Sequence, residues 1–478
     1  MATSNVSPNS ESKESGKSAS IPKVKLWTMF RLGLFQMALG IMSILTLGVL
    51  NRVMIEELQV PALIVAGAIA MHQFVAPIRV WFGQMSDTKP LLGYHRSGYV
   101  WVGAALFAIV SFFAVQVVWQ LGFSLQSGWT SQSSGWAALL ALIFALYGVA
   151  ISASSTPFAA LLVDVSDEDN RSKLVGVVWS MLMVGIIIGA IISSGLLRQI
   201  ALNAPLEVIQ TQVNRLFLIV PGIAFALCLL STVGVEKKYS RYTMRSTAIN
   251  REDKITLGMA MQVLTASRQT AIFFTFLLLM TLSLFMQDAV LEPYGGEVFK
   301  MTIAETTKLN AFFGTGTLIG LSLTGFLIAP RLGKKNTTKL GCVAVAVCLI
   351  IIVLAGTTAN AKFLQWSLTL FGFASGVTTT GALSLMLDLT AAETAGTFIG
   401  AWGLAQAMAR ALATVSGGAV LNLGKSFLTT PLFAYGLVFT IQAVVILLAL
   451  GLLAKVNVTE FQRNAKQAIA SILESELD

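Results

Sequence analysis

Five side chains that can carry a charge or bind a ligand lie inside, or at the end of, long apolar stretches of the sequence. They are His72, Arg79, Asp288, Glu292 and Arg410. A charged group in an apolar membrane interior needs an opposite charge, water or a ligand, because hydrocarbon does not solvate it. These five residues are therefore the candidates for binding a ligand or a substrate.

His72 stands near the middle of the second apolar stretch. A neutral imidazole there could ligate the magnesium of a chlorin, relay a proton, or hydrogen-bond a neighbouring helix, which would be a purely structural role. Arg79 lies one helical turn before Gly83 and could extend its guanidinium to the lipid headgroups. Arg410 lies more than three turns inside its stretch and cannot easily do so.

The segment QDAVLEPYGGEVF closes the seventh apolar stretch and contains two carboxylates. Asp288 and Glu292 are four residues apart, a spacing that predicts both on one face of a helix. Pro293 and the two glycines that follow it are expected to end that helix. The two acids could form a cation or proton site, and they could equally cap a helix end that faces water.

The composition indicates an all-α polytopic membrane protein. Of 478 residues, 55% are apolar and 12% are charged, and the apolar residues form long runs separated by short polar breaks. The net charge of +9 does not indicate nucleic-acid binding, because the basic residues concentrate in the loops between these runs. The pattern predicts neither an enzyme nor a metal site of the protein's own. The cysteines are expected to pack as small apolar side chains: Cys228, Cys342 and Cys348.

Apolar runs of about 20 residues predict twelve transmembrane helices, of which the second is expected over residues 61–83. Basic residues concentrate on the loops that share a side with the termini, so both termini are expected to be cytoplasmic. The expected divisions are a disordered tail (1–28), a six-helix half (29–235), a basic linker (236–270), a second six-helix half (271–454) and an amphipathic tail helix or soluble tail (455–478).

Two segments indicate that the halves are related. LLVDVSDEDNRSKLVG and LMLDLTAAETAGTFIG align at a constant offset of 224 residues, so that Asp164 matches Asp388. Gly148 and Gly372 match at the same offset, one helix earlier. Two similar six-helix halves joined by a basic linker resemble the major facilitator architecture, in which two parallel repeats surround a central cavity.

The turn after the second apolar stretch resembles the loop between helices two and three of facilitator proteins. That loop has the form Gly-x-x-x-Asp, followed by basic residues and a glycine. A carboxylate and cations in a cytoplasmic turn could latch the halves by switching ion pairs, although an ordinary positively charged turn is the alternative. The candidate latch residues are Gly83, Asp87, Lys89, Gly93, Arg96, Asp164, Arg171 and Asp388.

Several longer segments together resemble the PucC, or bacteriochlorophyll delivery, family of facilitator-type membrane proteins. They include LNRVMIEELQVPALIVAG, APIRVWFGQMSD, GYHRSGYVW, QDAVLEPYGGEVF and FGFASGVTTTGALSLMLDL. The resemblance extends from Met29 to Leu453, and FGQMSDTKPLLGYHR is most similar to the branch from oxygenic phototrophs.

The resemblance implies an assembly factor for light-harvesting or photosystem complexes that binds or delivers (bacterio)chlorophyll. Its implied partners are chlorophyll-binding antenna or photosystem subunits, with chlorophyll synthase as a further candidate. The implied location is the thylakoid or cytoplasmic membrane of a phototrophic bacterium.

Two other functions remain open, a proton-coupled transporter of a small molecule and a docking scaffold without pigment. A proton-coupled transporter needs titratable groups at mid-depth, whereas most acids in this sequence stand at helix ends.

Overall fold

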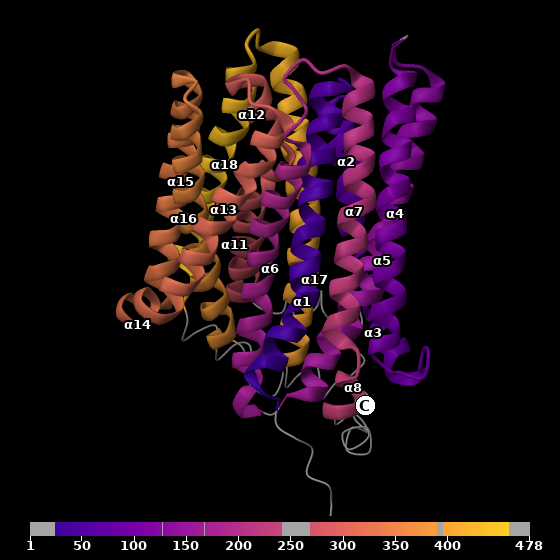
Figure 1. Ribbon diagram of the computed structural model, residues 1–478. Coiled ribbons are helices and arrows are strands. Elements are labelled where there is room, and N and C mark those ends of the chain that lie inside the picture. The colour runs from indigo at the N-terminus through magenta and orange to yellow at the C-terminus, as the bar shows by residue number, and fades with distance from the viewer. Residues whose placement is uncertain (1–23, 127, 167, 241–267, 390–394, 458–478) are drawn as a thin grey trace, which may run out of the picture.

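The computed structural model describes residues 24–126, 128–166, 168–240, 268–389 and 395–457, and the regular elements in these ranges are helices (Figure 1). Much of the two predicted tails and of the predicted linker lies outside the described residues. The start of the first helix and the end of the last lie at the same end of the molecule, here called the terminal end (Figure 1). The opposite end is called the far end.

Six spans form the N-terminal half. They are α1 (Leu26–Ser43), which continues as the π-helices η1 (Ile44–Leu50) and η2 (Val53–Glu57); α2 (Ala62–Phe74) followed by α3 (Ile78–Thr88); α4 (Ser97–Ser124); α5 (Ser131–Val165); α6 (Glu168–Leu197); and α7 (Leu206–Thr232) followed by the short α8 (Val235–Tyr239).

Six further spans form the C-terminal half. They are α11 (Arg268–Phe285), the 3₁₀ turn η3 (Met286–Ala289) and α12 (Leu291–Phe299); α13 (Ile303–Leu323), the π-helix η4 (Thr324–Ile328) and α14 (Ala329–Leu332); α15 (Lys334–Thr358); α16 (Ala361–Leu389); α17 (Ala395–Phe427); and α18 (Pro431–Lys455).

Eleven helices in the described part of the chain are long and apolar enough to cross a membrane. The remaining one of the twelve predicted spans, the second along the chain, is formed by α2 together with α3. This span is not one continuous helix. Pro77 has no N–H to donate to the carbonyl of Gln73, which instead accepts from the backbone N–H of Ala76 at 3.0 Å. The helix therefore ends at Phe74 and restarts at Ile78.

The two halves repeat the same close helix approach. A Cβ atom on Gly148 of α5 would overlap the backbone of His72 in α2, and one on Gly372 of α16 would overlap the backbone of Phe313 in α13. These are the fourth span against the second and the tenth against the eighth. The glycines matched by the sequence repeat thus occupy equivalent packing positions, where only a residue without a side chain allows such an approach.

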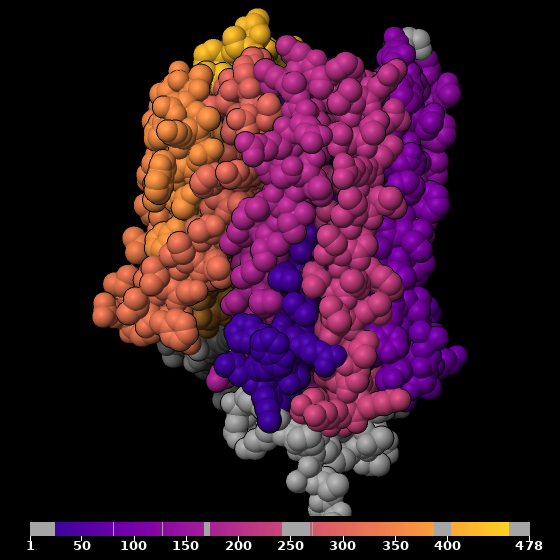
Figure 2. Space-filling view, in the orientation of Figure 1, coloured from indigo at the N-terminus to yellow at the C-terminus, as the bar shows by residue number. Residues whose placement is uncertain are grey.

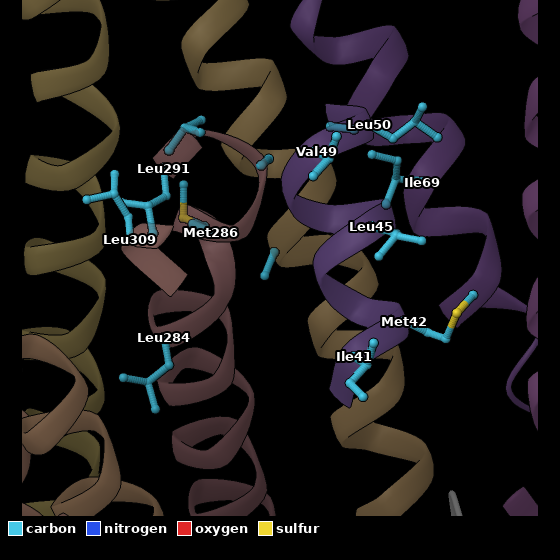
Figure 3. Close-up of a cluster of buried hydrophobic side chains, with 14 of the residues drawn as sticks. Ile41, Met42, Leu45, Val49, Leu50, Ile69, Leu284, Met286, Leu291 and Leu309 are labelled. Atoms are coloured by element: carbon cyan, nitrogen blue, oxygen red, sulfur yellow. The ribbon is translucent and has the colours of Figure 1, made fainter. Parts of the chain in front are cut away.

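Two pairs of spans make the most extensive contacts between the halves. Gly314 of α13 faces Ile186 and Ile187 of α6, and Gly418 of α17 approaches Ala62 and Ala66 of α2 so closely that a Cβ atom would overlap them. The second and eleventh spans are therefore neighbours. Apolar side chains fill the interior beside this boundary: in Figure 3, Val49 and Leu50 of η1 lie beside Ile69, while Met286, Leu291 and Leu309 gather at the break in the seventh span.

The outer surface is apolar, as the hydrocarbon of a bilayer requires. Leu218 on α7, Trp366 on α16 and Leu448 on α18 are among many large apolar side chains that stay exposed. Figure 2 shows helices of both halves side by side on one face, with the first turns of α1 emerging between α6 and α7 near the terminal end. The three cysteines are buried and unpaired, as expected. The chain is a multi-pass membrane protein.

The helix contacts predict that two glycine-to-alanine substitutions change the free energy of unfolding by different amounts. A methyl group on Gly316 of α13 would overlap the carbonyl oxygen of Thr369 in α16, whereas one on Gly222 of α7 meets no atom within 4 Å. Gly316→Ala is expected to lower the free energy of unfolding by about 1–3 kcal/mol through overpacking. Gly222→Ala is expected to leave it unchanged or slightly raised, because alanine favours helix. Thermal unfolding in detergent measures both, and equal midpoints would contradict the close approach.

Candidate functional site

The central cluster consists of His72, Arg79, Asp288 and Arg410, and three different spans position it. His72 ends the regular part of α2 and Arg79 follows the break at Pro77, so the break lies between them. Asp288 stands in the 3₁₀ turn η3, and Arg410 is in the middle of α17. Arg410 acts electrostatically on His72 and on Asp288, so residues separated by hundreds of positions in the sequence lie close together.

The imidazole of His72 is held by its own helix. Its Nδ1 lies 2.5 Å from the carbonyl oxygen of Ile69, and a carbonyl oxygen can only accept, so Nδ1 carries the proton in this contact. The ring also meets the edge of Tyr147 from α5, with the ring centres 6.3 Å apart. Among the described residues Nε2 has no hydrogen-bond partner, which leaves its lone pair available.

Arg79 and Arg410 come from opposite halves and both side chains are accessible. The guanidinium carbon of Arg410 lies 3.7 Å from the ring centre of Phe285, so the cation stacks on an aromatic face. The charges of Asp288 and Arg79 act on Arg410. No hydrogen bond or ion pair joins either guanidinium to another described residue.

The expectation that Asp288 and Glu292 share one helical face is wrong. The helix is interrupted between them by η3 and Val290, so the two carboxylates enter different environments. The expectation that Pro293 and the glycine pair end the helix is also wrong, because α12 runs through them to Phe299. Pro293 falls in the first turn of α12, where a backbone N–H has no intrahelical partner and its absence costs little.

A second cluster, the far-end cluster, joins the halves and is centred on Arg52. The Arg52 side chain is 1% exposed and forms an ion pair with Glu56 at 2.8 Å. It also donates across the boundary to Thr306 Oγ1 at 2.6 Å and to the carbonyl oxygen of Met301 at 2.9 Å. Sequence reasoning did not identify Arg52 as a site residue. Its i, i+4 spacing to Glu56 was the one available signal, because the bonds across the boundary span about 250 residues.

Glu292 and Asn310 complete the far-end cluster. The Glu292 carboxyl is buried and accepts a hydrogen bond from Asn310 Nδ2 at 2.5 Å. It packs directly on Gly48 of η1, and Glu56 packs in the same way on Gly296 of α12. A Cβ atom on either glycine would overlap the carboxylate, so each half supplies a bare backbone position for an acid of the other half.

The predicted latch loop forms the terminal-end cluster of Asp87, Arg96 and Asp164. Arg96 binds Asp164 at 2.9 Å and Asp87 at 2.5 Å, and it donates to Ser86 Oγ at 2.6 Å. Burial lowers the pKa of the Arg96 guanidinium, but the hydrogen bonds and charges of Asp164 and Asp87 outweigh burial and raise that pKa above its ordinary value. Arg96 therefore stays charged, and these contacts tie the second, third and fourth spans of one half together.

The rest of the latch loop is a tight hairpin. Leu92 and Gly93 have φ angles of 53° and 78°, and Leu91 and Tyr94 exchange two backbone hydrogen bonds around them, as in a type I′ turn. The Glu236 carboxylate accepts backbone N–H bonds at the start of α4. Gly83 lies inside α3 and Lys89 follows its last residue. The side chains of Arg171 and Asp388 lie outside the described residues, so a latch between halves stays a prediction.

The geometry of the terminal-end cluster predicts that its two carboxylates contribute unequally to the free energy of unfolding. The Asp164 side chain is 8% exposed, whereas that of Asp87 is 55% exposed. Asp164→Asn removes the buried negative charge that compensates the Arg96 guanidinium, and it should lower the free energy of unfolding by about 3–5 kcal/mol. Asp87→Asn should cost about 1 kcal/mol or less, because water screens an exposed pair. Reversible unfolding in mixed micelles compares the two, and equal losses would contradict this ranking.

The far-end cluster predicts that Arg52 holds the halves together. Arg52→Gln removes the charge that compensates Glu56 and shortens the reach to Thr306, so the far end should open more often. A reporter cysteine replacing Ala289, which is 2% exposed, should react faster with a membrane-impermeant maleimide in this variant. Arg198→Gln, at an exposed arginine outside the cluster, is the matched control. Equal labelling rates in the two variants would rule out this role.

The chain matches known sequences over most of its length. The family model described as PUCC protein matches residues 49–461. Protein PucC of Rhodobacter capsulatus is 30% identical over 440 residues, which cover 90% of this chain and 92% of that protein. A protein named bacteriochlorophyll synthase 44.5 kDa chain, also of Rhodobacter capsulatus, is 31% identical over 435 residues, covering 88% and 93% of the two chains.

Solved transporters share the fold. The nucleoside transporter NupG has a TM-score of 0.65 at 15% identity, covering 90% of this chain and 98% of its own. A D-xylose-proton symporter also has a TM-score of 0.65 at 15% identity, covering 89% and 97%. At such identities the likeness shows the fold alone, and it confirms the expected major facilitator-type architecture. Since the family model and the relatives cover most of the sequence, the chain belongs to the PucC family.

Proposed function

We propose that this protein is a membrane assembly factor for chlorophyll-binding complexes and that it binds a chlorophyll-type pigment at the central cluster. The observation that carries the proposal is the orientation of His72. Its Nδ1 proton is committed to the Ile69 carbonyl, and Nε2 has no hydrogen-bond partner among the described residues. Metal-ligating histidines are commonly fixed in this way, with one ring nitrogen bonded to a carbonyl and the other facing the metal.

The neighbouring residues fit such a ligand. A neutral imidazole can ligate the magnesium of a chlorin, and His72 Nε2 would supply that nitrogen ligand. His72 is half-buried beside the ring of Tyr147, so its surroundings are largely apolar. The four residues of the central cluster would supply polar anchors for an otherwise apolar pigment. In this proposal Glu292 belongs to the far-end cluster and does not contact the pigment.

The family supports the biological setting. One relative is named as a chain of bacteriochlorophyll synthase, which connects that protein with pigment metabolism. We infer that this protein serves antenna or photosystem subunits, with chlorophyll synthase as a further candidate partner, in the thylakoid or cytoplasmic membrane of a phototroph. Lys89, Arg96 and Lys237 lie at or near the terminal end, which supports a cytoplasmic location for both termini. No step in this role requires an enzymatic reaction.

A second candidate function is proton-coupled transport of a small molecule. The buried Glu292 carboxyl beside the Arg52 ion pair, on a fold shared with a proton symporter, favours it. Its test is proton-driven uptake of solute by proteoliposomes, which Arg410→Ala should abolish. Copurification with chlorophyll-binding subunits without bound pigment would instead favour a docking scaffold.

The proposal predicts that His72 determines pigment content. Protein purified from pigment-containing membranes should carry a magnesium chlorin, and His72→Ala should lose most of it, because an alanine offers no ligand for the magnesium. The chain has two histidines, so His95→Gln in the loop is the matched control and should retain the pigment. Pigment extraction from monodisperse protein gives the molar ratio of pigment to protein. Pigment-free wild-type protein, or full retention in His72→Ala, would refute pigment binding at this site.

A further inference from the structure

The arginines of the three clusters, Arg52, Arg79, Arg96 and Arg410, divide into two classes. Arg52 is paired with Glu56, Thr306 and a backbone carbonyl, and Arg96 is paired with two aspartates and a serine. Arg79 and Arg410 have no hydrogen-bond or ion-pair partner among the described residues. A guanidinium presents five N–H donors, so the central cluster holds two unused sets of donors in an apolar setting.

The charges of the central cluster do not balance. Arg79 and Arg410 are cations that act on each other, and Asp288 is the one carboxylate among the described residues whose charge acts on Arg410. Asp288 is also bonded to the Gln287 amide at 3.3 Å. With a neutral imidazole at His72, the sum is two positive charges and one negative charge. The cluster is therefore complementary to a ligand that carries one negative charge.

The stacking of Arg410 on Phe285 favours a carboxylate over a phosphate as the negatively charged group of the ligand. Phe285 covers one face of the guanidinium, so the N–H groups at its edge remain for a ligand. Two parallel N–H donors match the two oxygens of a carboxylate in a planar, bidentate pair. A phosphate monoester would bring up to two negative charges near neutral pH, more than the cluster lacks.

We propose that Arg79 and Arg410 bind a carboxylate of the ligand, so that the preferred pigment is a magnesium chlorin with a free carboxyl side chain and not its ester. This inference rests on the proposed function, because His72 and the arginine pair then hold one molecule at two points. Arg79 belongs to the N-terminal half and Arg410 to the C-terminal half, so a bound carboxylate also bridges the halves. An esterified chlorin meets His72 but leaves both guanidinium groups unpaired.

The test compares two probes that differ only in charge. The purified full-length protein is titrated with a magnesium chlorin bearing a free propionate and with the methyl ester of the same chlorin. The free acid should bind wild-type protein at least about tenfold more tightly, the effect expected of a charge-assisted hydrogen-bonded pair. Arg410→Gln should reduce the free-acid affinity to that of the ester and leave the ester unchanged. Arg198→Gln should alter neither.

The outcomes separate this inference from the proposed function. Equal affinities of wild-type protein for the free acid and the ester would overturn the carboxylate site. In that case, a His72→Ala variant that binds neither probe would still support pigment binding at His72. If neither probe binds, the proposed function fails and the inference fails with it. Dodecanoate supplies the same carboxylate without a chlorin. If it displaces the free acid at comparable concentration, the cluster is a general fatty-acid site and the pigment assignment is overturned.

Discussion

The ion pair and hydrogen bonds of Arg52 are the constraint on which the closed far end depends. The guanidinium is almost fully buried, so removing its partners would leave an uncompensated cation in a medium of low polarity. Its partners come from both halves: Glu56 from its own span, and Thr306 and the Met301 carbonyl from the other half. The neighbouring Asn51 amide donates across the same boundary to the Ala289 carbonyl at 2.9 Å. The halves therefore cannot separate here without exposing or abandoning this charge.

Charged clusters occur at three levels of the molecule, and they differ in how completely the protein satisfies them. The terminal-end and far-end clusters place their arginines against acids and hydroxyls of the chain itself. The central cluster leaves two guanidinium groups and one imidazole nitrogen without such partners in the described part of the chain. Both guanidinium groups are exposed, so partners for them would come from a ligand or from water and not from the fold.

Interruptions of helix geometry set this arrangement. The first and seventh spans, which are equivalent in the two halves, become π- or 3₁₀-helical near the far end. The second and eighth spans, also equivalent, are interrupted at Pro77 and at η4 on their way to the terminal end. Such interruptions often mark functional sites, because they re-aim the side chains that follow. Here they send Asp288 and Glu292 to different clusters and set His72 and Arg79 on either side of a break.

The sequence by itself determined the class of the protein. Apolar runs, the placement of basic residues, the repeat that pairs Gly148 with Gly372 and the PucC motifs predicted the helical fold, its two halves and its family, because these depend on composition and local spacing. It also identified His72, Arg79 and Arg410 as unusual, since isolated polar residues in apolar runs are visible without coordinates. Only the tertiary structure decided which charges meet. Arg52 and Thr306 are 254 residues apart, and no local pattern encodes contacts that arise when two halves fold against each other.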